Sequence, residues 1–417
     1  MYENPVITVV GLGYVGLPLA VALARHFEVM GYDIDEDRIR ELREGHDRTG
    51  ELGRGELTDS ALEYVMDPEA LKEAHIFIVT VPTPVDAENK PDLRAVESAS
   101  RFVGRLIRMG SIVVYESTVY PGCTEEFCGP ILEAESGLIS GQDFFLGYSP
   151  ERINPGDKVH RVDSITKVVA GQTEKVAQLL AQVYGAMNGN DTFVARDIRT
   201  AEASKVIENA QRDINIAFVN EIAEIFGRMG LSIYDVLEAA KTKWNFLPFS
   251  PGLVGGHCIG VDPYYLAHAA EKIGVHPQVI LSGRQINDNM AQSIAGRIDK
   301  ELDGPSRLLV LGVTFKENVP DIRNTKVIDL VRALEERGHD VAVYDPIADA
   351  DEIRQHYGLE VIETPDLAYD AVIGAVPHNG FAELPLRGLV KAGGLVADIK
   401  GIWRKRSIPQ GLRYWTL

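Results

Sequence analysis

The chain has few cysteines, no long hydrophobic run and a shortage of positive charge, and each absence excludes a class of protein. Three cysteines in 417 residues, none at C-x-x-C spacing, support neither a disulfide framework nor a zinc ribbon, so free thiols and no bound metal are expected. No run of 18 apolar residues and no signal-peptide pattern is present, which predicts a soluble, cytoplasmic protein that spans no membrane. The formal net charge of −19 argues against binding of nucleic acid, which would require a basic face.

Length and the order of apolar segments indicate several domains. At about 150 residues per domain, a chain of 417 residues is expected to hold two or three. Short β-branched runs alternate with helical stretches near both ends, whereas the middle is helical. We predict an α/β protein with two Rossmann-like, doubly wound domains joined by a long central helix in an all-α middle domain. The predicted boundaries are 1–198, 199–300 and 301–417.

A strand, a glycine-rich turn and a helix open the chain in the order of a dinucleotide-binding fingerprint. The apolar run 6–10 precedes Gly-Leu-Gly-Tyr-Val-Gly (11–16) and an apolar helical stretch, and the next strand-like run, 29–32, ends at Asp33. The glycines permit a tight turn and close approach to a pyrophosphate, and the acidic residue accepts from ribose hydroxyls, which favours NAD over NADP. A glycine-rich turn without a ligand is the alternative. The predicted cofactor-binding residues are Gly11, Gly13, Tyr14, Val15, Gly16, Asp33, Arg38, Thr83, Thr118 and Arg323.

Polar residues follow two further predicted strands, 75–81 and 111–115. Thr83 comes after the first strand and Thr118 after the second. Ligands bind at the carboxyl edge of an open parallel sheet, so both threonines are candidates for contact with cofactor or substrate. The alternative is that they only cap the turns that follow.

A stretch of 30 residues, 197–226, contains neither Gly nor Pro and places apolar residues at helical spacing. A helix of that length extends about 45 Å, which is enough to link two domains. Lys205 and Asn209 are four residues apart and so share one helix face. They are either ordinary polar residues of a solvated face or a pair of donors for an oxyanion.

The stretch 252–265 concentrates a single thiol, Cys258, among four glycines, with Asp262 four residues later. A thiol is a strong nucleophile only as thiolate, and glycine-rich backbone lets N–H groups and substrate approach it closely. The alternative is a cysteine that only packs in the interior. A metal site or hydrolase triad made of His257, Cys258 and Asp262 is disfavoured, because adjacent residues rarely aim at the same point.

The last third repeats the opening pattern without its glycines, and 324–338 is predicted to be an amphipathic helix ended by a glycine. The strand-like runs 29–32 and 340–344 both end in Tyr-Asp, but the second copy carries Thr-Phe-Lys (314–316) in place of the fingerprint. A phosphate-bearing ligand different from NAD fits that replacement, with Lys316 and Arg323 as its counter-charges.

Taken together, these segments resemble the nucleotide-sugar 6-dehydrogenases, the family of the UDP-glucose and GDP-mannose dehydrogenases. The segments that carry the resemblance are GLGYVGLPLA (11–20), VPTP (81–84), ESTVYPG (116–122), YSPERINPGD (148–157), AEASKVIENAQRDINIAFVNE (201–221), GLVGGHCIGVDPYYL (252–266) and FKENVPDIRNTK (315–326). The residues of these segments are most similar to those of the branch that acts on UDP-N-acetylglucosamine or UDP-N-acetylgalactosamine.

The resemblance implies a two-step oxidation of the sugar C6 alcohol to a carboxylate with NAD, through a thiohemiacetal and a thioester on Cys258. The product would feed synthesis of a surface polysaccharide. The implied catalytic residues are Cys258, Lys205, Asn209, Asp262, Glu151 and Thr118. The implied substrate contacts are Glu151, Arg152, Lys205, Asn209, Phe249, Gly255 and Lys316.

The resemblance also implies a homodimer that forms through the central helix. Relatives that oxidise UDP-glucose supply an arginine from the stretch before the cysteine loop to the neighbouring subunit's site, and Lys243 lies in that stretch here.

Three alternatives remain at this point. One is the same reaction on UDP-glucose or UDP-N-acetylmannosamine. Another is a two-electron dehydrogenase of 3-hydroxy acids, which needs neither Cys258 nor a second α/β domain. The third is a non-catalytic NAD-sensing protein. Two NADH per substrate would exclude the second alternative, and turnover of any UDP-sugar would exclude the third.

Overall fold

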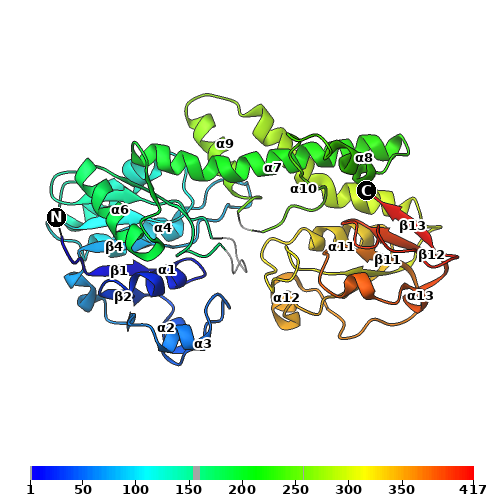
Figure 1. The fold of residues 1–417 in the computed structure, drawn as a ribbon, viewed down its shortest axis with the longest axis horizontal. Helices are drawn as coiled ribbons and strands as arrows, with labels where there is room; N and C mark the ends of the chain where they lie inside the picture. Colours follow the sequence, from blue (N-terminus) through cyan, green and yellow to red (C-terminus); the bar gives the residue numbers. More distant parts are fainter. Residues whose placement is uncertain (1, 154–159, 257) are drawn as a thin grey trace. The chain divides into compact units, whose positions relative to one another are not determined.

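The computed structural model describes residues 2–153, 160–256 and 258–417, and the chain divides into two compact units (Figure 1). The first unit comprises Met1–Glu208 and Tyr264–His276, and the second comprises Asn209–Pro263 and Pro277–Leu417. The division into three domains stays a prediction. Among the described residues, no helix combines the length and the apolarity that crossing a membrane requires.

The first unit is built on a sheet of eight strands in the order β3-β2-β1-β4-β5-β6-β7-β8. Its first six strands follow the order of a dinucleotide-binding doubly wound sheet. Neighbouring strands are parallel except β6 and β7. The strands are β1 (Ile7–Val10), β2 (Val29–Tyr32), β3 (Glu63–Val65), β4 (Ile76–Val79), β5 (Ile112–Tyr115), β6 (Phe145–Tyr148), β7 (Lys167–Gly171) and β8 (Thr192–Val194).

Helices of this unit cover a sheet whose central strands β1, β4 and β5 are wholly buried, as their continuous apolar runs require. The helices are α1 (Gly16–Leu23), α2 (Glu36–Arg43), α3 (Arg54–Thr58), α4 (Arg94–Gly104), α5 (Gly129–Ser136) and α6 (Glu174–Asn188), with a 3-10 helix η1 (Pro68–Glu73) and a π-helix η2 (Thr124–Cys128). The core of α1, β1 and α6 is built from Leu, Ile and Val side chains.

Long helices occupy the middle of the sequence. They are α7 (Ile198–Arg228), α8 (Ile233–Ala240), α9 (Asp262–Lys272) and α10 (Gln278–Asp299). The helix predicted over 197–226 is therefore confirmed as α7, with its ends shifted by one and two residues.

The second unit contains a parallel sheet in the order β10-β9-β11-β12-β13. Alternate residues of β9 (Arg307–Leu311) face two different cores, Leu308 and Val310 one of them and Leu309 and Leu311 the other. The remaining elements are β10 (Asp340–Tyr344), β11 (Tyr369–Gly374), β12 (Val390–Asp398), β13 (Arg413–Thr416), α11 (Val327–Glu335), α12 (Ala350–Tyr357), α13 (Leu386–Leu389) and the 3-10 helix η3 (Phe381–Glu383). The predicted class, α/β with two Rossmann-like sheets and a long central helix, is confirmed.

One predicted boundary differs. The sequence predicts a helix from Asn324, but α11 begins at Val327. Asn324 has a φ of +51°, and its side chain donates to the carbonyl of Gly256 at 3.0 Å. Its amide therefore holds the cysteine loop instead of continuing a helix.

Candidate functional site

The turn between β1 and α1 has the close contacts that a dinucleotide-binding turn needs. Gly11 N donates to the carbonyl of Tyr32 at 2.8 Å, and Gly11 has a φ of +97°, which favours glycine. A Cβ on Gly16 would lie 1.9 Å from the carbonyl oxygen of Gly11, so helix and turn meet without room for a side chain. A Cβ on Gly13 would meet nothing within 4 Å, which leaves this backbone open to a ligand. The turn therefore fits the pyrophosphate of NAD.

Asp33 holds the same turn and stays half-buried rather than enclosed. One carboxylate oxygen accepts from Leu12 N at 2.7 Å and the other from Asp35 N at 2.9 Å. The predicted cofactor contact Arg38 is buried: its Nε donates to the carbonyl of Leu12 at 2.9 Å, and it pairs with Asp47 at 2.7 Å. Arg38 thus fixes the turn from within the fold.

Thr80, which follows β4, was not predicted from the sequence as a residue of the site. Its buried hydroxyl donates to the carbonyl of Gly11 at 2.6 Å. The available signal was a polar residue at the carboxyl end of a buried strand. The predicted contacts Tyr14, Thr83 and Thr118 are half-buried, whereas Val15 is buried at the start of α1.

The loops that carry Thr83 and Thr118 are joined to each other. Ser117 donates its hydroxyl proton to the carbonyl of Val81 at 2.6 Å, and Tyr265 donates to the carbonyl of Pro84 at 3.0 Å. The two threonines therefore stand at neighbouring ends of β4 and β5, where the sheet order predicts a ligand edge.

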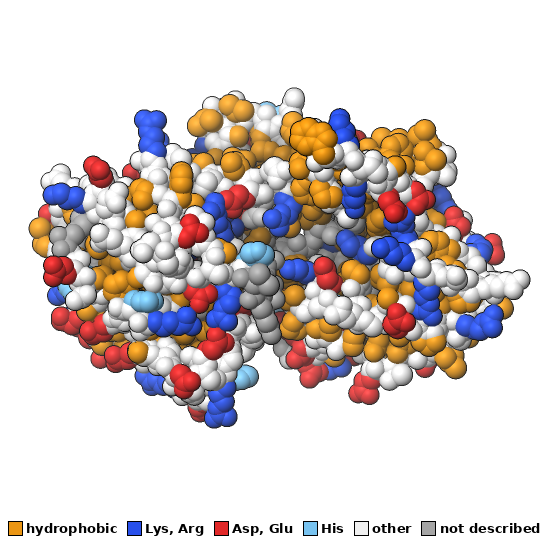
Figure 2. Space-filling view, viewed as in Figure 1, with side chains coloured by type: hydrophobic (Ala, Val, Ile, Leu, Met, Phe, Trp, Pro, Cys, Tyr) orange, Lys and Arg blue, Asp and Glu red, His pale blue; other side chains and the backbone are white. Residues whose placement is uncertain are grey.

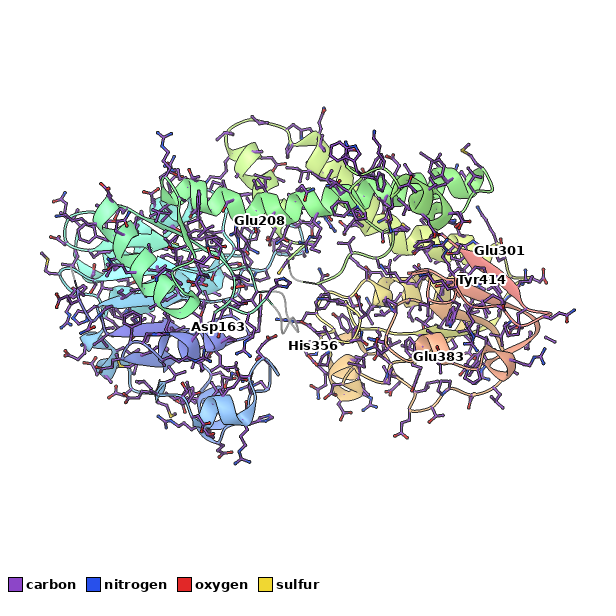
Figure 3. All side chains as sticks on the ribbon, in the orientation of Figure 1. Asp163, Glu208, Glu301, His356, Glu383 and Tyr414 are labelled. Carbon is purple, nitrogen blue, oxygen red and sulfur yellow. The ribbon has the colours of Figure 1, made fainter. Side chains whose placement is uncertain are left out.

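Glu151, just after β6, is buried in the first unit. One of its carboxylate oxygens accepts from Ile153 N, and the other has no hydrogen-bond partner among the described residues. Burial raises the pKa of Glu151, while the positive charges of Lys167 and Lys205 oppose the rise. An acid with a raised pKa suits proton transfer near neutral pH. The predicted substrate contact Arg152 pairs with Glu208, which lies on α7 (Figure 3).

Lys205 is buried on α7, so the reading as an ordinary solvated charge is wrong. One turn earlier, Glu202 accepts from Gly122 N at 2.5 Å and from Thr124 N at 2.9 Å, and burial raises its pKa to about 7. Glu202 was also missed, because a Glu on a helix usually faces solvent. It anchors α7 to the segment after β5.

The second unit contains the cysteine loop. Cys258 is half-buried, whereas Cys123 and Cys128 are buried. The carbonyl of Cys258 accepts from Asp262 N at 2.9 Å, and Asn209 Nδ2 donates to Asp262 Oδ2 at 2.5 Å. The structure thus brings Asn209 and Asp262 together at the turn that carries the thiol. His257 and the Asn-Pro-Gly-Asp part of 148–157 lie outside the described residues.

Glycines let the cysteine loop pack against the segment between β9 and α11. A Cβ on Gly255 would lie 2.9 Å from the carbonyl oxygen of Asn324, and Gly256 has a φ of +82°. Gly255 and Lys316 line one pocket in this unit. Lys400, which follows β12 and was not predicted, lines it as well, and burial lowers its pKa.

Two further predicted residues of this unit lie apart from that pocket's lining. Phe249 packs against the hydrophobic core, and Arg323 is exposed and forms a two-pronged pair with Asp321, with its shortest contact at 2.5 Å.

The start of the cysteine loop is fixed by Asn220 of α7. Its side-chain amide donates to the carbonyl of Gly252 at 3.1 Å and accepts from Gly252 N at 2.8 Å. Asn220 also bonds to Asn287 of α10, which in turn donates to Asp213, the partner of Arg284. A buried polar network therefore connects the loop with both helices.

Models of one family match the chain in three consecutive segments. The NAD binding domain of the UDP-glucose/GDP-mannose dehydrogenase family matches residues 6–188, the central domain 199–289 and the UDP binding domain 309–405. The NAD binding domain confirms the predicted cofactor, and the UDP binding domain confirms a UDP-sugar as the class of ligand.

Relatives and solved structures cover the whole chain. Protein CapL of Staphylococcus aureus is 52% identical over 424 residues, which cover 99% of this chain and all of that protein. A UDP-N-acetyl-D-glucosamine 6-dehydrogenase of Pseudomonas aeruginosa is 50% identical, with 94% of this chain and 96% of that protein covered. The structure of a UDP-D-ManNAc dehydrogenase from Pyrococcus horikoshii matches with a TM-score of 0.88 at 30% identity, covering 99% and 98% of the two chains. The chain therefore belongs to the UDP-glucose/GDP-mannose dehydrogenase family and is an NAD-dependent UDP-sugar 6-dehydrogenase.

Proposed function

We propose that this enzyme oxidises the C6 hydroxyl of a UDP-N-acetylhexosamine, UDP-N-acetylglucosamine or UDP-N-acetylgalactosamine, to the uronic acid. Two relatives named UDP-N-acetyl-D-glucosamine 6-dehydrogenase, from Pseudomonas aeruginosa and Salmonella typhi, are 50% and 48% identical over 94% of this chain. Relatives named UDP-N-acetyl-D-mannosamine dehydrogenase are 30% to 33% identical. This difference in identity supports the first substrate class over the second.

The observation that carries the proposed chemistry is the half-buried Cys258 on a turn whose Asp262 is held by Asn209. A plain alcohol dehydrogenase stops at the aldehyde, because a hydride cannot leave a carbonyl carbon until a nucleophile has added to it. Bound NAD accepts one hydride in each oxidation, so two NADH form per UDP-sugar. A thiolate makes the second oxidation accessible to the same enzyme.

In this proposal the Cys258 sulfur adds to the aldehyde carbon and forms a C–S bond, which gives a thiohemiacetal. Lys205 and Asn209 stabilise the negative charge that develops on the C6 oxygen. After the second oxidation the sugar is a thioester on Cys258.

Hydrolysis then releases the product. Asp262 and Thr118 hold a water, Glu151 takes its proton, and the water oxygen bonds to the thioester carbon. The C–S bond breaks with its electron pair returning to sulfur. Product carboxylate and free Cys258 remain.

NADH release measured with a panel of UDP-N-acetylglucosamine, UDP-N-acetylgalactosamine, UDP-N-acetylmannosamine and UDP-glucose tests the proposed substrate. We expect two NADH per sugar and the highest kcat/KM with an N-acetylhexosamine of gluco or galacto configuration. One NADH per sugar, with an aldehyde as product, would contradict the covalent route.

The nucleophile is tested with Cys258→Ser. We expect turnover to be lost while binding of NAD and UDP-sugar, measured by calorimetry, is retained. The buried Cys128→Ala serves as the matched control and should keep turnover. Wild-type turnover in Cys258→Ser would exclude a thioester.

We also propose a homodimer that forms through α7. Phe218 and Ile225 are exposed large apolar residues of this helix, and the exposed Met229 directly follows its last residue. At about 100° per residue their directions fall within about 40° of one another. They form one apolar stripe on α7, and Figure 2 shows hydrophobic side chains on the surface over the C-terminal part of α7 and over α8. Water-exposed stripes of this kind favour burial against a partner.

Light scattering after size exclusion tests the dimer. Phe218→Glu should give a monomer, whereas Arg212→Glu, an exposed position about 120° away on α7, should not. A monomeric wild type at micromolar concentration would refute the proposal. The low cysteine content of three in 417 residues, with Cys123 and Cys128 buried and outside any disulfide, supports a cytoplasmic location.

A further inference from the structure

A buried ion pair lies beside Glu151 in the first unit, and the proposed reaction gives it no role. Lys167 Nζ contacts Glu116 Oε1 at 2.5 Å, and Tyr184 donates its hydroxyl proton to Glu116 Oε2 at 2.7 Å. The Lys167 ammonium also lies 5.2 Å from the centre of the Tyr184 ring. Side chains of Lys167 and Glu116 are 1% and 0% exposed. Burying two charges is costly, and replacement by apolar side chains is often neutral or stabilising, so stability alone is a weak reason for this pair.

The reversed direction of β7 brings the pair to the sheet edge that carries Glu151. The neighbouring strand β6 is antiparallel to β7, and Tyr148 is paired with Ala170. Glu151 follows Tyr148 by three residues and Lys167 precedes Ala170 by three residues, so in this antiparallel pair both lie toward the same edge of the sheet. In a parallel strand the first residue would lie at the opposite edge of the sheet. Glu116 reaches the same edge, because it directly follows β5, and the carbonyl of its neighbour Tyr115 accepts from Ser149 N at 3.1 Å.

We infer that Lys167 is a positioning residue that keeps Glu151 in the carboxylate form for hydrolysis of the thioester, while Glu116 offsets part of the lysine charge. The inference rests on the proposed function, in which Glu151 takes the proton of the attacking water. Glu151 has one carboxylate oxygen without a hydrogen-bond partner among the described residues, so it depends on nearby charge for its ionisation.

Among the residues that the structure describes, the charged groups that face Glu151 come from three elements. Lys167 of β7 and Lys205 of α7 lower the pKa of Glu151, and Glu116 raises it, while burial raises it most. The neighbouring Arg152 is paired with Glu208. Lys205 is assigned to the oxyanion in the proposed reaction, which leaves Lys167 and Glu116 as the two groups whose charge is available for tuning Glu151 alone.

The two members of the pair act in opposite directions, and this gives the test its sign. Removing the positive charge, in Lys167→Met, raises the pKa of Glu151. The acid limb, which is the part of the pH–rate profile where the steady-state rate falls with falling pH, therefore moves to higher pH by about one unit or more. Removing the negative charge, in Glu116→Gln, moves the limb to lower pH. The double variant Lys167→Met/Glu116→Gln keeps the local charge balance and should return close to the wild-type limb. A purely structural role predicts no such reversal.

The experiment measures NADH formation by the full-length enzyme with UDP-N-acetylglucosamine between pH 5 and pH 9, in stopped flow and in steady state. A thioester that hydrolyses slowly gives a burst of NADH followed by a slower phase. In Lys167→Met the burst should persist, while the slow phase at pH below the limb falls about tenfold. Lys167→Arg should retain the wild-type profile.

Tyr184→Phe is the matched control, because it removes a buried hydrogen bond to Glu116 without changing a charge. It should lower the melting temperature and leave the limb in place. If Lys167→Met does not fold, the expected shift of the acid limb to lower pH in Glu116→Gln still tests the inference. Wild-type limbs in both single variants, with normal wild-type turnover and an inactive Cys258→Ser, would overturn this inference alone. Absence of NADH from wild type with every UDP-sugar would instead overturn the proposed function.

Discussion

The chain makes the same glycine turn after β1 and after β9, one in each unit. Gly11 N donates to the carbonyl of Tyr32 at 2.8 Å, and Gly312 N donates to that of Tyr344 at 2.9 Å. The two glycines have φ values of +97° and +88°. In each turn an aspartate at the end of the next strand accepts from the N–H that follows the glycine, at 2.7 Å in both units. Backbone bonding is thus the same in the two halves.

The surroundings of the two aspartates differ. Asp33 stays half-buried, but Asp345 is enclosed: His378 Nε2 contacts its Oδ2 at 2.9 Å. Burial opposes the charge of Asp345, yet hydrogen bonds from His378 and from Val313 N outweigh it and lower the pKa to about 2. A histidine thus bonds to the second carboxylate, whereas we propose that the first carboxylate binds the ribose of NAD. The second turn is therefore a structural copy that is closed at its aspartate, and the pocket of that unit is lined by Lys316 and Lys400.

The largest expected effect tests the structural role of Asp345. Asp345→Asn should lower the free energy of unfolding by about 3 kcal/mol, because it removes a buried carboxylate that accepts hydrogen bonds from His378 and from backbone N–H groups. Guanidinium unfolding measures this, and NAD affinity should not change. Asp340→Asn, an exposed position on the same strand, is the control. A loss of NAD affinity without a loss of stability would mean that Asp345 binds a nucleotide.

The same carboxylate predicts a pH dependence. Its folded-state pKa of about 2 lies below the ordinary aspartate pKa of 3.8. Its contribution to stability is therefore present above about pH 4 and is lost as the pH falls toward 2. Asp345→Asn should be less sensitive to acid than wild type over this interval.

Gly16→Ala tests the first turn. Its Cβ would lie 1.9 Å from a backbone oxygen, so turn and helix must separate, and NAD affinity should fall about 100-fold. Calorimetric titration with NAD measures the loss. Gly55→Ala, where a Cβ meets nothing within 4 Å, is the control and should bind NAD as wild type does.

Asp33→Ala addresses the open aspartate. We expect NAD to bind about 10-fold more weakly, because a hydrogen bond to a charged group contributes about 1.5 kcal/mol or more. UDP-sugar affinity should not change, and the exposed Asp37→Ala should leave both affinities intact. A fall in UDP-sugar affinity in Asp33→Ala would show that the halves do not divide the ligands as described.

The smallest effect is expected for Gly13→Ala. The position is open in the protein alone, so the melting temperature should stay within about 2 °C of wild type. NAD affinity should fall about threefold, since the added methyl group meets only the bound pyrophosphate. A large loss of stability would place Gly13 in the fold rather than at the ligand.

Much of the fold could be predicted because its signals are local. The second strand was predicted at its observed bounds, 29–32, and the central helix within two residues, since periodicity and the lack of Gly and Pro depend on neighbouring residues only. The start of α11 was wrong by three residues, because Asn324 takes a left-handed conformation that a distant loop stabilises.

The candidate site could be predicted where the motif itself explains why its residues are needed. The glycines of the first turn and the loop of Cys258 are such motifs. Thr80, Glu202 and Lys167 were not found, because their partners are separated from them by 69, 80 and 51 positions. Nothing in the local sequence tells a buried, paired side chain of this kind from a solvated one.

The sequence by itself determined that this chain binds NAD at a fingerprint turn and carries a single thiol on a glycine-rich loop. The conformations that only glycine adopts and the spacing of apolar residues along a helix are local properties, and they are sufficient for these two predictions. Only the tertiary structure decided that Asp345 is closed by His378 while Asp33 stays open, and that the buried Lys167–Glu116 pair lies at the sheet edge that carries Glu151. Both arrangements depend on strands that become neighbours only after folding. The order of the strands and the reversed direction of β7 determine which charged side chains are buried together at one edge of the sheet.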